Sequence, residues 1–164
     1  LNIGARRITI STSGIITGIH KLILENLQIE LSISLHAADD KVRSQIMPVN
    51  KIYPLADLIK CCHVYIARTN RQITFEYILI KGFNAGLAEA QALAGLLKDL
   101  RLAKVNLIPA NPILELKIVP PTEIEAEEFK ECLFKCGINV TLRQERGQDI
   151  DASCGQLRLR HEDK

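Results

Sequence analysis

Apolar and polar residues alternate one by one in several short segments of this chain. The segment 29–36 shows the pattern best, with Ile29, Leu31, Ile33 and Leu35 on one side and Glu30, Ser32, Ser34 and His36 on the other. A period of two is typical of a β-strand that buries one face. Similar segments, or short runs rich in β-branched residues, predict further strands at 6–12, 72–80, 103–109 and 138–144.

Segments with a helical period lie between these strands. Apolar residues that recur every three or four positions predict helices at 18–27, 54–67 and 86–100. A last helix is predicted to begin after Thr122, which forms a capping box with Glu125, and to end at Gly137. The stretch between 36 and 54 is predicted to be a loop. Because strands and helices alternate along the chain, we expect an α/β fold with a parallel sheet and outer helices.

The polar faces of the strands favour a partial barrel over a sheet covered on both sides. Strands buried on both faces are usually continuous apolar runs, whereas Thr74 and Glu76 interrupt one strand here and Asn106 interrupts another. We therefore expect the polar faces to line an interior that holds a polar ligand; a sheet with one face in water is the alternative. Ligands of α/β barrels bind at the carboxyl ends of strands, which here are the stretches 11–14, 34–40, 79–84 and 108–112.

Composition limits the classes of protein. The chain has 164 residues, 47% of them apolar and 24% charged, which is typical of a single globular domain, 1–164. The residues at about 145–164 show neither a helical nor a strand period, and we expect an irregular, mobile tail there. The net charge of +2 is too small to indicate a nucleic-acid partner, and the absence of Trp argues against a stacking platform for single strands. No apolar run reaches the roughly 18 residues of a membrane span. The first residue is Leu, so we expect the chain to be cut from a longer protein.

The five cysteines show no disulfide spacing, and no secretion signal is evident, so a reducing cytosol is expected. Cys132 and Cys136 follow the spacing of a buried helical face, as does Cys62, and all three are predicted to pack in the core rather than bind a metal. Cys154 is different because it lies in the polar stretch "DIDASCGQL", which has no apolar period. From these residues alone, a reactive thiol and an incidental one are equally good interpretations. His36 likewise either contacts a ligand or is a satisfied interior histidine.

Four stretches together carry a family resemblance: "RRITISTSG", "ISLHAADDKVRSQIMPVN", "VNLIPANP" and "RGQDIDASCGQL". In this order and spacing they resemble the RlmN/Cfr family. These are radical S-adenosylmethionine (SAM) methyltransferases that methylate an adenine of large-subunit ribosomal RNA, and RlmN members also act on transfer RNA. The resemblance covers nearly the whole chain but only the C-terminal half of a family member.

The resemblance implies roles for particular residues. Cys154 is the cysteine that receives a methyl group from SAM and carries it, as S-methylcysteine, to the adenine, where C2 is the expected acceptor and C8 the alternative. The residues at the family's SAM-binding positions are Ser11, Ser34, Leu35, His36 and Asn111. The expected cofactors are SAM and a [4Fe–4S] cluster, and the expected partners are rRNA, tRNA and a reductant such as flavodoxin or ferredoxin, in the cytoplasm and without a membrane.

The sequence also departs from the family pattern. The C-x-x-x-C-x-x-C motif that holds the cluster is absent, so the cluster cysteines are expected N-terminal to residue 1 and this segment alone is expected to be inactive. Ala85 stands where an Asp is expected, which predicts a weaker helix cap, and Ser153 replaces an Ala. Two other interpretations stay open: a non-catalytic remnant that serves as a binding or scaffold module, and an unrelated thiol enzyme that pairs Cys154 with a histidine.

Overall fold

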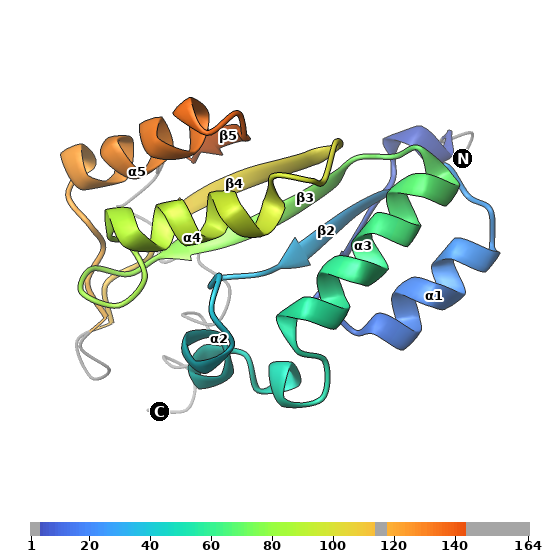
Figure 1. The fold of residues 1–164 in the computed structure, drawn as a ribbon, viewed down its shortest axis with the longest axis horizontal. Helices are drawn as coiled ribbons and strands as arrows, with labels where there is room; N and C mark the ends of the chain where they lie inside the picture. Colours follow the sequence, from blue (N-terminus) through green and yellow to red (C-terminus); the bar gives the residue numbers. More distant parts are fainter. Residues whose placement is uncertain (1–3, 114–117, 144–164) are drawn as a thin grey trace, which may run out of the picture.

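Five parallel strands form one sheet in which spatial order follows chain order (Figure 1). We describe a computed structural model, which covers residues 4–113 and 118–143. The strands are β1 (Thr9–Thr12), β2 (Glu30–Ser34), β3 (Ile73–Leu79), β4 (Ala103–Pro109) and β5 (Asn139–Leu142). Because each strand pairs in parallel with the next, every connection must cross back over the sheet, and helices make these crossings. The predicted α/β architecture is confirmed.

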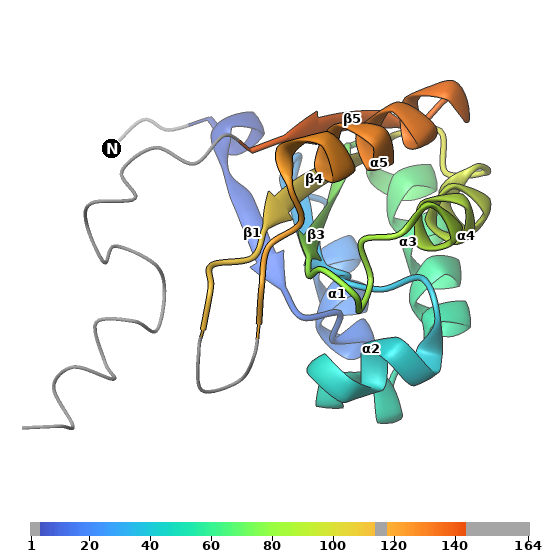
Figure 2. The same ribbon diagram turned by 90° about the vertical axis from the view of Figure 1, so that its left-hand side faces the viewer.

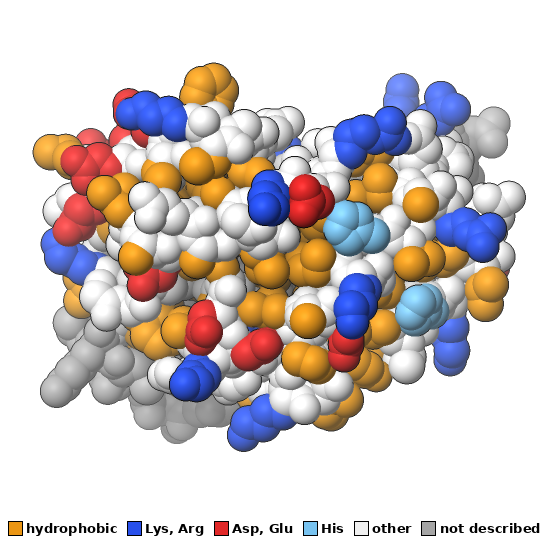
Figure 3. Space-filling model, in the orientation of Figure 1, with side chains coloured by type: hydrophobic (Ala, Val, Ile, Leu, Met, Phe, Trp, Pro, Cys, Tyr) orange, Lys and Arg blue, Asp and Glu red, His pale blue; other side chains and the backbone are white. Residues whose placement is uncertain are grey.

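The helices pack on one face of the sheet (Figure 2). They are α1 (Ile16–Leu24), α3 (Leu55–Thr69), α4 (Leu87–Leu97) and α5 (Glu123–Lys135), with the short α2 (Asp40–Ile46) and 3-10 turns at Ala5–Arg7 and Pro48–Lys51. On the side of this helical layer seen in Figure 3, charged side chains of both signs are scattered and Lys and Arg form no single patch. No helix in the described part of the chain is long and apolar enough to span a membrane.

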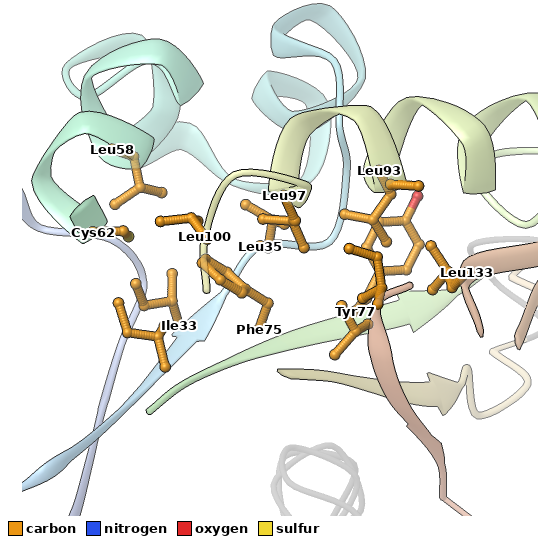
Figure 4. Packing of buried hydrophobic residues seen from close by; sticks show 14 of the residues in the cluster. Ile33, Leu35, Leu58, Cys62, Phe75, Tyr77, Leu93, Leu97, Leu100 and Leu133 are labelled. Carbon is orange, nitrogen blue, oxygen red and sulfur yellow. The ribbon is translucent and has the colours of Figure 1, made fainter. Parts of the chain in front are cut away.

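One hydrophobic core lies between the helices and the sheet (Figure 4). Ile33, Phe75 and Val105 stand side by side in register on neighbouring strands and are fully buried. Leucines of α3, α4 and α5 pack onto this row, and the rings of Tyr77 and Phe129 lie 5.5 Å apart. Complete burial of each such side chain stabilises the fold by about 1.5–3 kcal/mol. The core therefore fixes which faces of β2 to β5 point away from the helices, whereas β1 contributes no residue to it and Ile10 is exposed.

Two differences from the predicted elements change the type of structure, and other boundaries shift by a few residues, as at α1 (predicted at 18–27) and α4 (predicted at 86–100). The strand predicted at 6–12 begins only at Thr9, because Ala5–Arg7 form a 3-10 turn. The loop predicted before Pro54 contains α2, whose first amide groups are capped by Asp39: its carboxylate accepts hydrogen bonds from the N–H groups of Lys41 (2.8 Å) and Val42 (3.1 Å). A helix of two turns offers too few apolar positions for its period to be recognised.

The capping predictions are confirmed. Thr122 Oγ1 accepts a hydrogen bond from the Glu125 N–H at 3.2 Å, and the Glu125 carboxylate accepts one from the Thr122 N–H at 2.7 Å. At the start of α4 the cap residue is Gly86 rather than Ala85, so the weaker cap expected from Ala85 stays a prediction.

The cysteines agree with the prediction only in part. Cys62 is fully buried on the core-facing side of α3, and Cys132 is half-buried against the core. Cys136, predicted to pack in the core, is exposed. That prediction is wrong because α5 ends at Lys135, and the chain turns at Gly137 with a φ of +80°, so the helical period no longer applies at Cys136.

Candidate active site at the carboxyl ends of the strands

The polar residues of the strands share the face of the sheet opposite the helices. Ser34, Glu76, Asn106 and Thr141 lie next to one another in register across β2 to β5. In the described residues no helix packs on this face (Figure 2). The alternation seen in the sequence therefore separates an apolar, helix-covered face from a polar one.

A chain of hydrogen bonds crosses this polar face with Glu76 at its centre. One carboxylate oxygen of Glu76 accepts from Ser32 Oγ at 3.0 Å, and the other accepts from Asn106 Nδ2 at 2.6 Å. Thr141 Oγ1 donates in turn to Asn106 Oδ1 at 3.2 Å. The network fixes side chains from four strands, so the polar face is an ordered surface of oxygen and nitrogen atoms.

His36 follows β2 directly and is held in an unusual conformation. Its φ is +60°, in the left-handed region that few residues other than glycine adopt. Its ring Nδ1 accepts a hydrogen bond from the Ile78 N–H at 3.1 Å. Burial, followed by the nearby charge of Arg43, lowers the pKa of His36 to about 4. At neutral pH the ring is therefore uncharged with its proton on Nε2, which makes it a hydrogen-bond donor and a poor general base.

Arg43, on α2, ties the ends of β1 and β2 together. It is fully buried, and its guanidinium donates to the carbonyl oxygens of Ser13 (2.9 Å), Ser34 (3.1 Å) and Leu35 (3.0 Å). Another of its N–H groups donates to Asn50 Oδ1 at 2.8 Å. The stretch 11–14 thus lies beside the stretch 34–40, as predicted for strand ends that converge.

Asn84 makes the corresponding connection between β2 and β3. Its buried amide donates to the carbonyl oxygens of His36 (2.8 Å) and Ile78 (2.7 Å) and accepts from the Ile80 N–H at 2.7 Å. Its own carbonyl accepts from the Tyr77 hydroxyl at 3.0 Å. The carboxyl ends of three neighbouring strands are therefore fixed by two buried polar side chains.

Similarity searches agree with this architecture. No family model matches the chain. Two curated relatives, both called probable dual-specificity RNA methyltransferase RlmN, come from Natranaerobius thermophilus (48% identical over 159 residues, 96% of this chain) and Symbiobacterium thermophilum (50% identical over 165 residues, 100% of this chain). The crystal structure of a radical SAM methyltransferase from Sphaerobacter thermophilus superposes with a TM-score of 0.89 at 46% identity, covering 94% of this chain and 45% of that one. The chain belongs to the RlmN/Cfr family.

The chain spans about half the length of the curated RlmN relatives it matches, 45% and 44% for the two named above. A domain of a pyruvate-formate lyase-activating enzyme from Bacteroides vulgatus shares the fold, with a TM-score of 0.65 at 18% identity. The partial barrel expected from the sequence is thus the radical SAM type of α/β fold, with a parallel sheet and outer helices.

Two residues at the family's SAM-binding positions, Ser34 and His36, lie together at the carboxyl end of β2, both half-buried. Ser11 is exposed on β1, where it pairs in register with Ser32. Asn111 is half-buried just beyond β4, which is tied to β3 by the hydrogen bond from the Ala110 N–H to the Leu79 carbonyl. Of the other two predicted site residues, Leu35 has a buried side chain and Cys154 lies outside the described residues.

The Leu35 side chain is fully buried and faces the helices. Its backbone is occupied as well, because Arg43 binds the carbonyl and the N–H donates to the Glu76 carbonyl at 3.0 Å. Cys154, predicted to be the methyl carrier, lies outside the described residues.

Sequence reasoning does not find Arg43 and Asn84. Charged and amide residues that follow a strand are usually solvent-exposed caps or turns, so neither residue type marks a buried position. The available signal is weak: Arg43 lies in the stretch between 36 and 54 that is predicted to be a loop, and Asn84 ends the strand-end stretch 79–84 without differing from ordinary turn residues.

Proposed function

We propose that this chain is the C-terminal part of a radical SAM methyltransferase that methylates an adenine, at C2, in large-subunit rRNA and in tRNA. Its strongest support is the superposition on a radical SAM methyltransferase over 94% of the chain, with the polar strand ends in the same fold. The proposed nucleic-acid partners follow the names of the RlmN relatives. The proposed reductant, flavodoxin or ferredoxin, and the cytoplasmic location follow the family alone.

The residues at the strand ends fit a bound SAM molecule. SAM presents ribose hydroxyls, an adenine and an amino-acid group, all of which need fixed hydrogen-bond partners. Ser34 offers a hydroxyl and His36 a neutral ring with its proton on Nε2, at the end of the face that carries the Glu76 network. We propose that these two bind SAM together with Ser11 and the Asn111 amide. Leu35, whose N–H and carbonyl are already bonded to Glu76 and Arg43, supports them by filling the core beneath the site. When bound, one SAM molecule would supply the methyl group, and a second SAM molecule, cleaved reductively, would supply a radical.

Cys61 and Cys62 do not fit an iron–sulfur cluster, and the described residues contain no group of three or more His, Cys, Asp or Glu side chains that could hold a metal. Cluster ligands are thiolates, whereas burial raises the pKa of Cys61 to about 11 and raises that of Cys62 further. Both lie on α3, in the core between the helices and the sheet. The sequence also lacks the C-x-x-x-C-x-x-C motif. We therefore propose that the [4Fe–4S] cluster of the complete enzyme is held by cysteines that precede residue 1.

Cys154 is proposed to carry the methyl group as a thioether. A carrier must reach first the SAM methyl group and then the RNA base. The tail expected from the sequence at about 145–164, which contains Cys154, lies outside the described residues. The His36 ring is an unsuitable partner for the competing thiol-enzyme interpretation, because an imidazole with a pKa of about 4 stays neutral at pH 7 and does not form an ion pair with a thiolate.

The test uses the complete enzyme with Cys154→Ala and, as a matched control, Cys132→Ala. We expect Cys154→Ala to abolish RNA methylation while SAM is still cleaved reductively. Cys132→Ala should keep methylation and lose about 1 kcal/mol of stability, as a small core deletion does. Mass spectrometry should find a single added methyl on the peptide that contains Cys154. An unmodified peptide in an enzyme that turns over, or methylation by Cys154→Ala, would show that the assignment is wrong.

The isolated chain offers a second test. Anaerobic incubation with iron and sulfide should yield no stoichiometric [4Fe–4S] absorbance and no methyltransferase activity. A full cluster spectrum would mean that Cys132 and Cys136, or other cysteines of this chain, are ligands after all.

A further inference from the structure

We propose that Arg43 and Asn84 act as positioning residues that clamp the segment 34–36 and so present Ser34 and His36 to the polar face. The role of this presentation in SAM binding rests on the proposed function, whereas the clamp itself is a property of the fold. Neither residue is among the five SAM-binding positions that the family resemblance assigns.

Three consecutive carbonyl groups are held from two sides. Arg43 binds the carbonyl oxygens of Ser34 (3.1 Å) and Leu35 (3.0 Å), and Asn84 binds that of His36 (2.8 Å). The Leu35 and His36 N–H groups both donate to the Glu76 carbonyl, at 3.0 and 3.3 Å. The backbone after β2 is therefore restrained residue by residue, which a strand end normally is not.

The restraint matters because His36 adopts an unfavourable conformation. A residue with a Cβ is destabilised in the left-handed region, and such conformations persist only where the surroundings over-determine them. The Asn84 bond to the His36 carbonyl and the Ile78 bond to Nδ1 fix the residue and its ring on the β3 side. With this conformation the backbone turns away from the direction of β2, and the ring reaches the backbone of Ile78 near the end of β3.

Arg43 has the geometry for a clamp and an environment that disfavours its charge. Its planar group directs several N–H donors at once, which a lysine ammonium on a flexible stem does not reproduce. A buried charge is usually no more stabilising than a well-packed apolar residue. Arg43 is nevertheless fully buried and is supported by a second layer, since Asn50 donates to the Asp40 carboxylate (2.9 Å) and to Ser44 Oγ (2.9 Å) while accepting from Arg43. Because burying this charge adds little to stability on balance, the buried guanidinium points to a role in holding the backbone of residues 34–36 in one conformation.

The experiment uses the 164-residue chain with Arg43→Lys and Asn84→Asp. Arg43→Lys keeps the charge and removes the fork, while Asn84→Asp keeps the shape and places a carboxylate oxygen against the carbonyls of His36 and Ile78. Arg71→Lys and Asn70→Asp are the matched controls. They lie at the amino end of β3, where Arg71 binds Glu30 and Asn70 accepts from Arg101.

Three measurements are made on every variant. Urea unfolding reports whether it folds, long-range proton–nitrogen NMR spectra report the state of the His36 ring nitrogens, and a SAM titration followed by NMR reports the dissociation constant. In the wild type and both controls we expect an unprotonated, hydrogen-bonded Nδ1 and equal SAM affinity within about twofold. In both clamp variants we expect averaged ring-nitrogen signals and SAM binding at least about tenfold weaker, although the chains unfold cooperatively.

The outcomes separate the clamp from the proposed function. If either clamp variant folds and keeps the wild-type ring signature, the clamp is refuted for that residue. If the wild-type chain shows no response to SAM, the proposed SAM site in this chain fails, and the ring signature still decides the clamp. Should Arg43→Lys not fold, Asn84→Asp decides the proposal by the same two readouts.

Discussion

Gly14 provides a quantitative test of how tightly the first strand end is packed. Its φ is +99°, and a Cβ at this position would lie 3.1 Å from Arg43 Nη2 and 3.1 Å from Leu58 Cδ2. Both neighbours are fully buried and cannot swing into solvent. The substitution Gly14→Ala therefore combines an unfavourable backbone conformation with a steric conflict.

The magnitude follows from these two contributions. A left-handed conformation costs a residue with a Cβ roughly 1–2 kcal/mol, and forcing extra volume into a packed site costs about 1–3 kcal/mol. We expect Gly14→Ala to lower the free energy of unfolding by about 3 kcal/mol, a large part of the roughly 5–15 kcal/mol typical of a domain.

Three other glycines separate the two contributions. Gly82 (φ +72°) and Gly137 (φ +80°) have no heavy atom within 4 Å of an added Cβ, so their alanine variants should lose only about 1–2 kcal/mol. Gly95 lies within α4 and is also uncrowded, and Gly95→Ala should stabilise the chain by about 0.5–1 kcal/mol.

The assay is urea unfolding followed by circular dichroism at neutral pH, with the slope of the transition checked for constancy among the variants. Equal losses for Gly14→Ala, Gly82→Ala and Gly137→Ala would refute the steric contribution at Gly14. No loss at Gly82 and Gly137 would refute the backbone contribution.

Further predictions concern titration and thiol reactivity. The pKa of Glu125 is lowered to about 2, first by the hydrogen bond from the Thr122 N–H and next by the hydrogen bond from Lys81. The stabilisation provided by the ionised Glu125 carboxylate should therefore be complete above about pH 4.5 and lost as the pH falls towards 2. Urea unfolding of Glu125→Gln should show a weaker acid dependence. His36 should titrate near pH 4 by NMR, and because its pKa lies below the ordinary 6.5, stability should fall as pH drops from about 6.5 to 4, an effect absent in His36→Gln. In the native chain, iodoacetamide should modify the exposed Cys136 and leave Cys62 unmodified, since burial raises the pKa of the Cys62 thiol; rapid labelling of Cys62 would contradict its buried position.

The surroundings of His36 bear on its two interpretations. The sequence leaves open whether this histidine contacts a ligand or is satisfied internally. The structure shows that Nδ1 is satisfied by the Ile78 N–H and that His36 is half-buried, two residues after Ser34 at the carboxyl end of β2. Contact with a ligand is part of the proposed function. The remaining ring nitrogen is the part that the proposed SAM site would use.

Local patterns determine the faces of the strands and several helix ends. Alternation in 29–36 and 72–80 predicts which side chains lie in the core, because successive side chains of a strand point to opposite faces whatever the sheet around them. Thr122 and Glu125 predict the start of α5 for a similar reason, since the capping box involves residues only three positions apart. The four ordered motifs also indicate the family on their own, and the RlmN relatives confirm it.

Tertiary structure alone decides the contacts that shape the candidate site. Arg43 meets Ser13 across 30 positions, Asn84 meets His36 across 48, and Glu76 meets Ser32 across 44. Such pairs depend on the register between strands and on where a crossover returns the chain, and neither is encoded in a local period. For the same reason Arg43, a residue type that is usually solvent-exposed, is fully buried once the ends of β1 and β2 surround it with carbonyl oxygens.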